Sequence, residues 1–393
     1  MNILLVDWNA MGNEYLIKNL RMLGHEVTTI PFDDVSMAEN EIEKNISNAC
    51  QHKDIDAIFS FNYFPSVSNC CLKLGIKYIS WVYDSPYINI YSYTVINPCN
   101  YIFIFDYGVY DELVSNGIKT VYYQPLAADM SRFANFESDR EAAAKYSSDI
   151  SFVGSLYNED KHNLYQKFDK VNQFSKGYLD ALIEMQVNIY GESIIEKAIT
   201  QEVFEEMSKA YPVNPDSPYV MTPKQIYTEY VLLRKTTSVE RNRIFENLSK
   251  YNAVETKKDI RIYTHENKIA LPNIKVCGPV DYYDEMPHVF KNSKINLNIS
   301  LRSIRTGIPL RVLDIMATGG FVITNYQAEI PEYFRPDEDI VIYSDIDDLI
   351  HKVDYYLEHE EERQIIAENG KRKVSEEFDM LKVLPKIISR AFQ

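Results

Sequence analysis

The chain has 393 residues, of which 41 are basic and 57 are acidic, so its formal net charge at pH 7 is −16. A surface of this charge repels nucleic acid and anionic membranes unless a local basic patch reverses the sign, and the sequence has no cluster of basic residues interleaved with aromatic ones. The length suggests two or three domains, and the hydrophobic content of 46% is ordinary for globular ones. We therefore expect a multidomain globular protein that does not bind nucleic acid.

Three features of the sequence indicate the cellular compartment of the protein. Residues 1–7 lack the basic n-region of a signal peptide, and no apolar run approaches the length of a membrane span. The five cysteines have no framework spacing, which is typical of reduced thiols. We expect a cytoplasmic protein without a transmembrane segment.

Strand and helix patterns alternate over residues 1–145. Each short apolar run predicts a buried strand and is followed by a loop and then by helical spacing of apolar residues. This alternation predicts a doubly wound parallel sheet, that is, a Rossmann-like α/β domain. The predicted strands are residues 3–6, 26–30, 57–61, 77–82, 101–105 and 120–123.

Polar residues follow several of these strands at the edge where open parallel sheets bind ligands. They are Asp7, Asn62, Asp84, Asp106 and Asp129. Asp84 stands just before Ser85-Pro86 and has two interpretations. It can act as a general base for a substrate hydroxyl, or orient that hydroxyl, or it can simply cap the turn that precedes the proline.

A second α/β pattern begins after a polar segment at residues 130–148, where we expect the interdomain linker. The predicted strands of this half are residues 149–153, 260–263, 274–277, 295–299, 321–324 and 340–343. Residues 160–257 are polar and mostly helical, which predicts a helical insert. We place the second domain at residues 146–375, and expect a C-terminal helix at residues 376–393 that packs back toward the first domain.

Gly154 and Ser155 directly follow the first strand of the second half. Glycine lets a backbone approach a ligand closely, so this loop can bind phosphate, although a tight turn explains it equally well. Neither the dinucleotide pattern G-x-G-x-x-G nor the Walker pattern is present.

Residues 306–324 read as a loop, a short helix, a glycine stop and a buried strand. Arg311 and Asp314 lie three residues apart and therefore share one face of the helix. A helix N-terminus behind the pair Thr306-Gly307 offers N–H groups and a cation to phosphate oxygens, and Asp314 can accept hydrogen bonds from ribose hydroxyls. The alternative is an ordinary βα unit with a surface Arg–Asp pair.

Several stretches resemble the CgeB-like, spore-maturation branch of bacterial GT-B glycosyltransferases. They are residues 81–86, 126–129, 152–156, 294–324 and 369–372. The resemblance implies a GT-B fold, in which two doubly wound Rossmann-like domains face a cleft, here with a helical insertion in the C-terminal half. It also implies a nucleotide-sugar donor bound mainly by the C-terminal domain and an acceptor contacted by the N-terminal domain.

The resemblance also implies roles for individual residues. Thr306, Gly307 and Arg311 would bind the diphosphate. Arg302 and Arg305 can stabilise the charge of the departing nucleoside diphosphate, or each can have a surface or salt-bridge role instead. Gly154 and Ser155 would form the donor loop, and Asp314 would bind the donor. Tyr282 and Tyr283 can stack on the base, although their packing in the core is an alternative. Retaining relatives often carry two glutamates eight positions apart; the second aligns with Asp314, but the first falls on Thr306.

The expected reaction is a metal-independent transfer of a sugar. Retention of the configuration at the anomeric carbon is one of its two stereochemical outcomes. His162, His265 and His288 lack ligand spacing, and no D-x-D motif stands in a suitable loop. We expect no cofactor beyond a UDP- or dTDP-linked sugar donor as substrate, and a glycan, a protein or a small molecule as acceptor. Two alternatives remain, namely a GT-B sugar-nucleotide epimerase and a non-catalytic binder of nucleotide sugars.

Overall fold

The computed structural model describes residues 1–33, 36–133, 136–214, 220–254, 257–266 and 270–393. The chain divides into two compact units. The first unit contains residues 1–132 and 376–393, together with Val220 and Met221, and the second contains the described residues of 133–215 and 222–375. Within these described residues, no helix is long and apolar enough to cross a membrane.

The first unit is built on a six-stranded parallel sheet with strand order β2-β1-β3-β4-β5-β6. Leu4 of the central strand β1 is fully buried and lies opposite Thr28 and Ile58 of the flanking strands. All six predicted strands are confirmed, with ends that shift by at most one residue. The strands are β1 (Asn2–Asp7), β2 (Glu26–Pro31), β3 (Ala57–Phe61), β4 (Lys77–Val82), β5 (Asn100–Ile104) and β6 (Val121–Tyr123).

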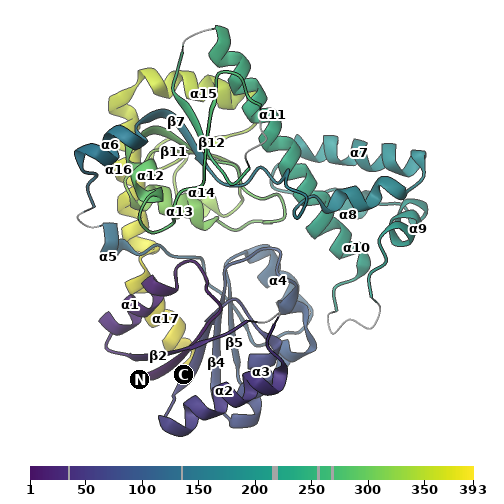
Figure 1. Ribbon diagram of the computed structural model, residues 1–393, viewed down its shortest axis with the longest axis vertical. Helices are drawn as coiled ribbons and strands as arrows, with labels where there is room; N and C mark the ends of the chain where they lie inside the picture. The colour runs from purple at the N-terminus through teal and green to yellow at the C-terminus, as the bar shows by residue number, and fades with distance from the viewer. Residues whose placement is uncertain (34–35, 134–135, 215–219, 255–256, 267–269) are drawn as a thin grey trace. The chain divides into compact units, whose positions relative to one another are not determined.

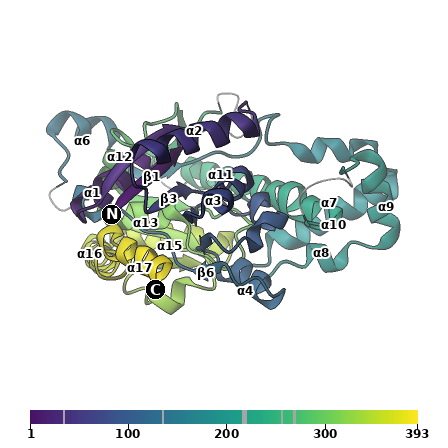
Figure 2. The same cartoon turned by 90° about the horizontal axis from the view of Figure 1, so that it is seen from below.

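Helices follow the strands of this unit as a doubly wound fold requires. Helices α2 and α3 pack against each other, as both views show (Figures 1 and 2). Helix α3 begins at Pro65, where a missing N–H costs no hydrogen bond, and ends at Gly75 with a φ of 67°. The elements are α1 (Asn13–Met22), α2 (Glu39–His52), α3 (Pro65–Leu74), η1 (Ile88–Tyr91), η2 (Tyr93–Ile96), α4 (Tyr107–Ser115) and α5 (Met130–Phe133).

The C-terminal helix α17 (Met380–Phe392) belongs to the first unit. It packs against α1, β4 and β5 through an apolar face that includes Val383, Leu384 and Ile387. Lys77 at the start of β4 donates a hydrogen bond of 2.5 Å to the carbonyl oxygen of Ala391. The chain thus returns to its first domain at its end.

The second unit also contains a six-stranded parallel sheet, with strand order β12-β11-β10-β7-β8-β9. Its core is formed by apolar strand residues such as Ile150, Ile262 and Ile323. The strands are β7 (Ser148–Val153), β8 (Ile260–Tyr263), β9 (Lys275–Cys277), β10 (Ser293–Asn298), β11 (Val322–Asn325) and β12 (Val341–Tyr343). The helices around it are α6 (Arg140–Tyr146), α12 (Met286–Asn292), α13 (Leu310–Ala317), α14 (Ile330–Tyr333), α15 (Ile346–Glu358) and α16 (Glu360–Glu377).

The expected helical insert separates β7 from β8 and has a hydrophobic core of its own, centred on residues such as Phe168, Leu179 and Tyr227. Helices α7, α8 and α9 stand together in Figure 1, and the long helix α11 leads from them back to the sheet. Its elements are η3 (Leu164–Lys170), α7 (Gln173–Val187), α8 (Ile195–Ala198), α9 (Gln201–Ala210), α10 (Pro223–Ile226), the π-helix η4 (Tyr227–Leu232) and α11 (Leu233–Val254).

The polar segment at residues 130–148 is not simply a linker. The first unit ends at Arg132, and helix α6 of the second unit occupies residues 140–146. Asp139 caps this helix by accepting a hydrogen bond of 2.7 Å from the backbone N–H of Ala142. The segment is polar because a short, largely exposed helix lies there; residues 134 and 135 lie outside the described part.

Candidate functional site

The carboxyl edge of the sheet in the second unit brings together most residues predicted to bind a donor. Gly154 and Ser155 follow β7, residues 302–307 follow β10, and Glu329 follows β11. Because all strands of this sheet are parallel, the loops after them gather at one edge, where α/β folds bind ligands.

The loop after β7 is held by an internal carboxylate. Oε1 of the buried Glu266 accepts hydrogen bonds from the backbone N–H of Leu156, at 2.6 Å, and from the hydroxyl of Ser155, at 3.1 Å. A β-carbon on Gly154 would lie only 3.1 Å from the ring of Phe152, so any larger residue at this position would require the ring to shift. Both contacts favour the tight-turn interpretation of Gly154-Ser155 over a phosphate loop.

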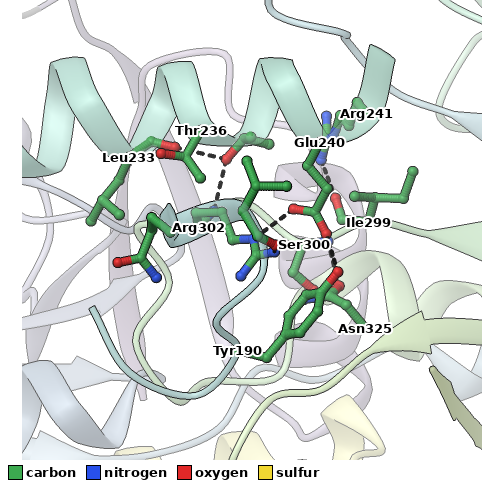
Figure 3. A network of polar contacts seen from close by, with 12 residues as sticks. Tyr190, Leu233, Thr236, Glu240, Arg241, Ile299, Ser300, Arg302 and Asn325 are labelled. Carbon is green, nitrogen blue, oxygen red and sulfur yellow. Dashed lines mark hydrogen bonds and ion pairs between the residues drawn. The ribbon is translucent and has the colours of Figure 1, made fainter. Parts of the chain in front are cut away.

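Arg302 lies in a buried network and not at an open site (Figure 3). Its Nε donates to Oε2 of Glu240 at 2.5 Å, and its two Nη atoms donate to the carbonyl oxygens of Val187 and Ile189 at 2.7 Å each. The guanidinium also lies 3.9 Å from the ring centroid of Tyr190, whose hydroxyl donates to Glu240. Every guanidinium nitrogen therefore has a protein acceptor, and the predicted role at the leaving group is replaced by a structural one.

Helix α11 uses this network to fix two loops of the edge (Figure 3). Arg241, the next residue on α11, donates to the carbonyl oxygens of Ser155 and Ile299, and burial lowers the pKa of its guanidinium. Thr237 accepts a hydrogen bond of 2.8 Å from the backbone N–H of Arg302. The helical insert thus ends in a helix that braces the loops after β7 and β10.

Arg311 differs from Arg302 in lacking a close oxygen acceptor among the described residues. Its Nη1 contacts the sulfur of Met286, and its nearest carboxylate oxygen, Oδ2 of Asp314, lies 3.9 Å away. Among the residues that the structure describes, none accepts a hydrogen bond from this guanidinium through oxygen. The side chain is 30% exposed, so it offers a partly desolvated cation to an anion from outside the protein.

Asp314 and Tyr282 lie beside Arg311. The side chain of Asp314 is only 9% exposed, and the hydroxyl of Tyr282 lies 3.5 Å from its Oδ1, a long hydrogen bond. The ring of Tyr282 is half-buried and meets that of Tyr283 edge to face at 5.2 Å. The three predicted donor residues Tyr282, Arg311 and Asp314 thus form one cluster at the start of α13.

Thr306 and Arg305 meet carboxylates that the sequence interpretation did not include. The hydroxyl of Thr306 donates to Oε1 of Glu329 at 2.7 Å, and Nη2 of Arg305 lies 3.3 Å from Oε1 of Glu229. Gly307, next to Thr306, is buried. Glu329 could have been found, because it stands five residues after a predicted strand at the ligand-binding edge.

Asp84 belongs to the first unit and follows β4. Its Oδ2 accepts a hydrogen bond of 2.7 Å from the amide of Asn62, whose Oδ1 accepts from the backbone N–H groups of Tyr83 and Asp84. The protein atoms that surround the carboxyl reduce its hydration and raise its pKa above the ordinary value, while the hydrogen bond from Asn62 acts in the opposite direction. The residue as a whole is exposed, so a substrate can approach it, as it must approach a proton acceptor.

Metal ligands do not gather in the described part of the chain, which contains no group of three or more His, Cys, Asp or Glu side chains able to hold an ion. Metal independence itself stays a prediction, because a donor diphosphate can supply ligands of its own.

Comparison with known sequences identifies the C-terminal part. Residues 241–388 match a family described as glycosyl transferase-like. An uncharacterized protein of Aquifex aeolicus is 24% identical over 321 residues, which cover 78% of this chain and 73% of that protein.

Comparison with solved structures identifies the fold. A glycosyltransferase from Rickettsia africae has a TM-score of 0.55 at 12% identity and covers 99% of this chain and 97% of its own. Sucrose-phosphate synthase from Thermosynechococcus elongatus has a TM-score of 0.54 at 10% identity, and the match covers 100% of this chain and 99% of the synthase. HepE of Anabaena, solved in complex with UDP-glucose, has a TM-score of 0.55 at 8% identity, with 99% of both chains covered. These similarities confirm the two-domain α/β fold of GT-B glycosyltransferases.

Proposed function

We propose that this chain, a GT-B fold with a glycosyltransferase-like C-terminal domain, transfers a sugar from a UDP- or dTDP-linked donor to an acceptor hydroxyl. HepE, which shares the fold, was solved with UDP-glucose, and this supports a uridine nucleotide as the first donor to test. The CgeB-like assignment and the nature of the acceptor, a glycan, a protein or a small molecule, belong to the same proposal.

The observation that carries the proposal is the state of Arg311. It is the predicted diphosphate ligand and lies in the first turn of α13. In the described part of the chain its guanidinium contacts the thioether of Met286, lies 5.5 Å from the ring centroid of Phe290, and has a carboxylate oxygen of Asp314 at 3.9 Å. A partly buried arginine that lacks a close anion is well suited to receive one, and guanidinium binds phosphate oxygens with directed hydrogen bonds. Negative charge on the diphosphate grows as the sugar departs, so this contact strengthens in the transition state.

The nucleoside would lie against Asp314 and Tyr282. The carboxylate of Asp314 is held nearly buried on the same helix face as Arg311, one turn farther along, and can accept two hydrogen bonds from ribose hydroxyls. Tyr282 supplies an aromatic ring at the same place, which suits stacking on a base.

The donor sugar would meet Glu329. Retaining relatives place a carboxylate eight residues before the position of Asp314, where this chain has Thr306. The structure has a carboxylate there nevertheless, because Glu329 reaches Thr306 from the end of β11. We include transfer with retention in the proposal for this reason.

In the proposed reaction the acceptor oxygen bonds to the anomeric carbon while the bond from that carbon to the diphosphate oxygen breaks. The electron pair of the broken bond stays on the diphosphate, next to Arg311. The acceptor proton leaves to a base, either Asp84, which can also orient the hydroxyl, or an oxygen of the departing diphosphate.

Thermal-shift measurements with UDP, dTDP and their glucose conjugates test nucleotide binding, since a ligand of the folded state raises the melting temperature. Incubation with donor, with and without acceptor candidates, then separates the alternatives. A glycosyltransferase releases nucleoside diphosphate, an epimerase converts the donor sugar without any acceptor, and a non-catalytic binder does neither. Release of nucleoside diphosphate supports the proposal, and either of the other results contradicts it.

A further inference from the structure

A basic pocket lies at the amino edge of the second sheet, opposite the edge that carries the donor cluster. It has a volume of about 550 Å³ and is lined by residues at the starts of β10 and β11, by the turn that precedes β11, and by one face of α16. This volume lies within the range of small-molecule sites, about 300–1,000 Å³. Its lining includes Lys291, Lys294, Arg363, Lys371 and one carboxylate, Glu368.

Three of the four cations in this pocket have no carboxylate partner among the described residues. Lys294 pairs with Asp149 at 2.8 Å. By contrast, Arg363 and Lys371 donate only to the neutral carbonyl oxygens of Tyr356 and Phe133, and Lys291 makes neither a hydrogen bond nor an ion pair in the part of the chain that the structure describes. Such a surplus of positive charge is unexpected in a chain with a net charge of −16.

Two of these cationic side chains, Lys291 and Lys371, lie beside Gly319. A β-carbon built on Gly319 would lie 3.5 Å from Nζ of Lys291 and 3.6 Å from Cδ of Lys371, so both side chains extend over this glycine. Burial and the neighbouring charge of Lys291 lower the pKa of Lys371 below its ordinary value. Gathering like charges costs free energy in the empty protein, and an anion between them would remove that cost.

We propose that this basic pocket is a second binding site, separate from the donor site, for a small phosphorylated molecule of two or more negative charges. Lys291 and Lys371 contact its phosphate oxygens beside Gly319, and the buried Arg363 adds positive charge to the lining of the pocket. Phe321 and Ala367 supply an apolar wall, and Glu368 stands where it can accept a hydrogen bond from a hydroxyl of the bound molecule. Nothing in this assignment depends on the proposed reaction.

Calorimetric titration with inorganic pyrophosphate tests the site in the full-length protein. The comparison uses wild type, Lys291→Met, Lys371→Met and the double variant, with Lys275→Met as a control at an exposed lysine of β9 in the same unit. Methionine keeps most of the aliphatic stem and removes the charge, and it relieves the repulsion between the two lysines, so the variants are expected to fold. Melting temperatures without anion, no lower than that of wild type, verify this.

Pyrophosphate can also bind at Arg311, so each titration is repeated in the Arg311→Ala background. We expect Arg311→Ala to retain pyrophosphate binding, each lysine variant to weaken it about tenfold or more, and the control to leave it unchanged. Higher salt should weaken the binding as well. The inference is overturned if Arg311→Ala shows no saturable binding, or if the double variant in that background binds pyrophosphate as tightly as its parent.

Discussion

Thr306 and Glu329 each donate a hydrogen bond to the other. The hydroxyl of Thr306 donates to Oε1 of Glu329 at 2.7 Å, and the backbone N–H of Glu329 donates to the carbonyl oxygen of Thr306 at 3.1 Å. The two residues come from loops after different strands, β10 and β11, and Glu329 is only 6% exposed. A carboxylate absent from its expected place in the sequence is thus present nearby in space.

The first prediction concerns this carboxylate. Glu329→Gln keeps an oxygen that can accept from Thr306 but removes the charge offered to the donor sugar. We expect kcat to fall about ten- to a hundredfold, the effect of one charged hydrogen bond, while UDP binds as before because it carries no sugar. Steady-state kinetics and UDP titration measure the two effects, with Glu332→Gln as an exposed control on α14. Unchanged kcat would remove Glu329 from the site.

The second prediction concerns stability. The side chains of Arg302 and Glu240 are 5% and 0% exposed, so Arg302→Met leaves a carboxylate buried without its cation. We expect a loss of about 3–5 kcal/mol in the free energy of unfolding, measured with urea. Arg335→Met, at a side chain that is 78% exposed, should change it by less than about 0.5 kcal/mol. Equal effects of the two substitutions would contradict the structural role of Arg302.

The double variant Arg302→Met/Glu240→Gln sharpens this test. Removing the second charge abolishes the uncompensated carboxylate, so the double variant should be more stable than Arg302→Met alone. If it is less stable by the sum of two independent losses, the pair is not coupled.

The third prediction concerns pH. A base acts in its deprotonated form, and the pKa of Asp84 is raised, so kcat/KM should increase with pH through a value above the ordinary one of about 3.9 for aspartate. Asp84→Asn should lower kcat/KM by about 10²–10⁴-fold and abolish this acidic limb, whereas the exposed control Asp111→Asn should do neither. A limb that persists in Asp84→Asn assigns the proton transfer to another group and leaves Asp84 an orienting role.

The fourth prediction is metal independence. Arg311 and the N-terminus of α13 offer positive charge to the diphosphate in the place where other enzymes use Mg²⁺. Activity should therefore persist in excess chelator. Complete loss that added Mg²⁺ or Mn²⁺ restores would show that the donor is bound through a metal.

The sequence was sufficient for the fold because both sheets consist of parallel strands buried on two faces. Such strands appear as short continuous apolar runs, and all twelve runs became strands. The helical insert was also evident from the sequence, because it interrupts the alternation of predicted strands and helices. The segment expected to be the interdomain linker, residues 130–148, contains the division between the two units at Arg132, but its polar composition did not reveal helix α6.

The sequence was less informative about the site, because the role of an arginine depends on the groups that it contacts in the folded protein. The sequence around Arg302, Arg305 and Arg311 does not show which of them is bound by a carboxylate. In the structure Arg302 lies next to Glu240, which stands sixty-two positions earlier in the chain. In the same way, Glu266 reaches the loop after β7 from more than a hundred residues away. Helical spacing did place Arg311 and Asp314 together, because that relation is local.

The central claim is that Arg311 and Asp314 bind the nucleoside diphosphate of the donor, and calorimetric titration of UDP tests it most directly. The titration compares wild type, Arg311→Ala and Asp314→Asn with the exposed control Arg335→Ala. We expect UDP to bind the wild type and the control equally, and to bind each of the other two variants about ten- to a hundredfold more weakly. If UDP binds Arg311→Ala and Asp314→Asn as tightly as wild type, the cluster at the start of α13 is not the donor site.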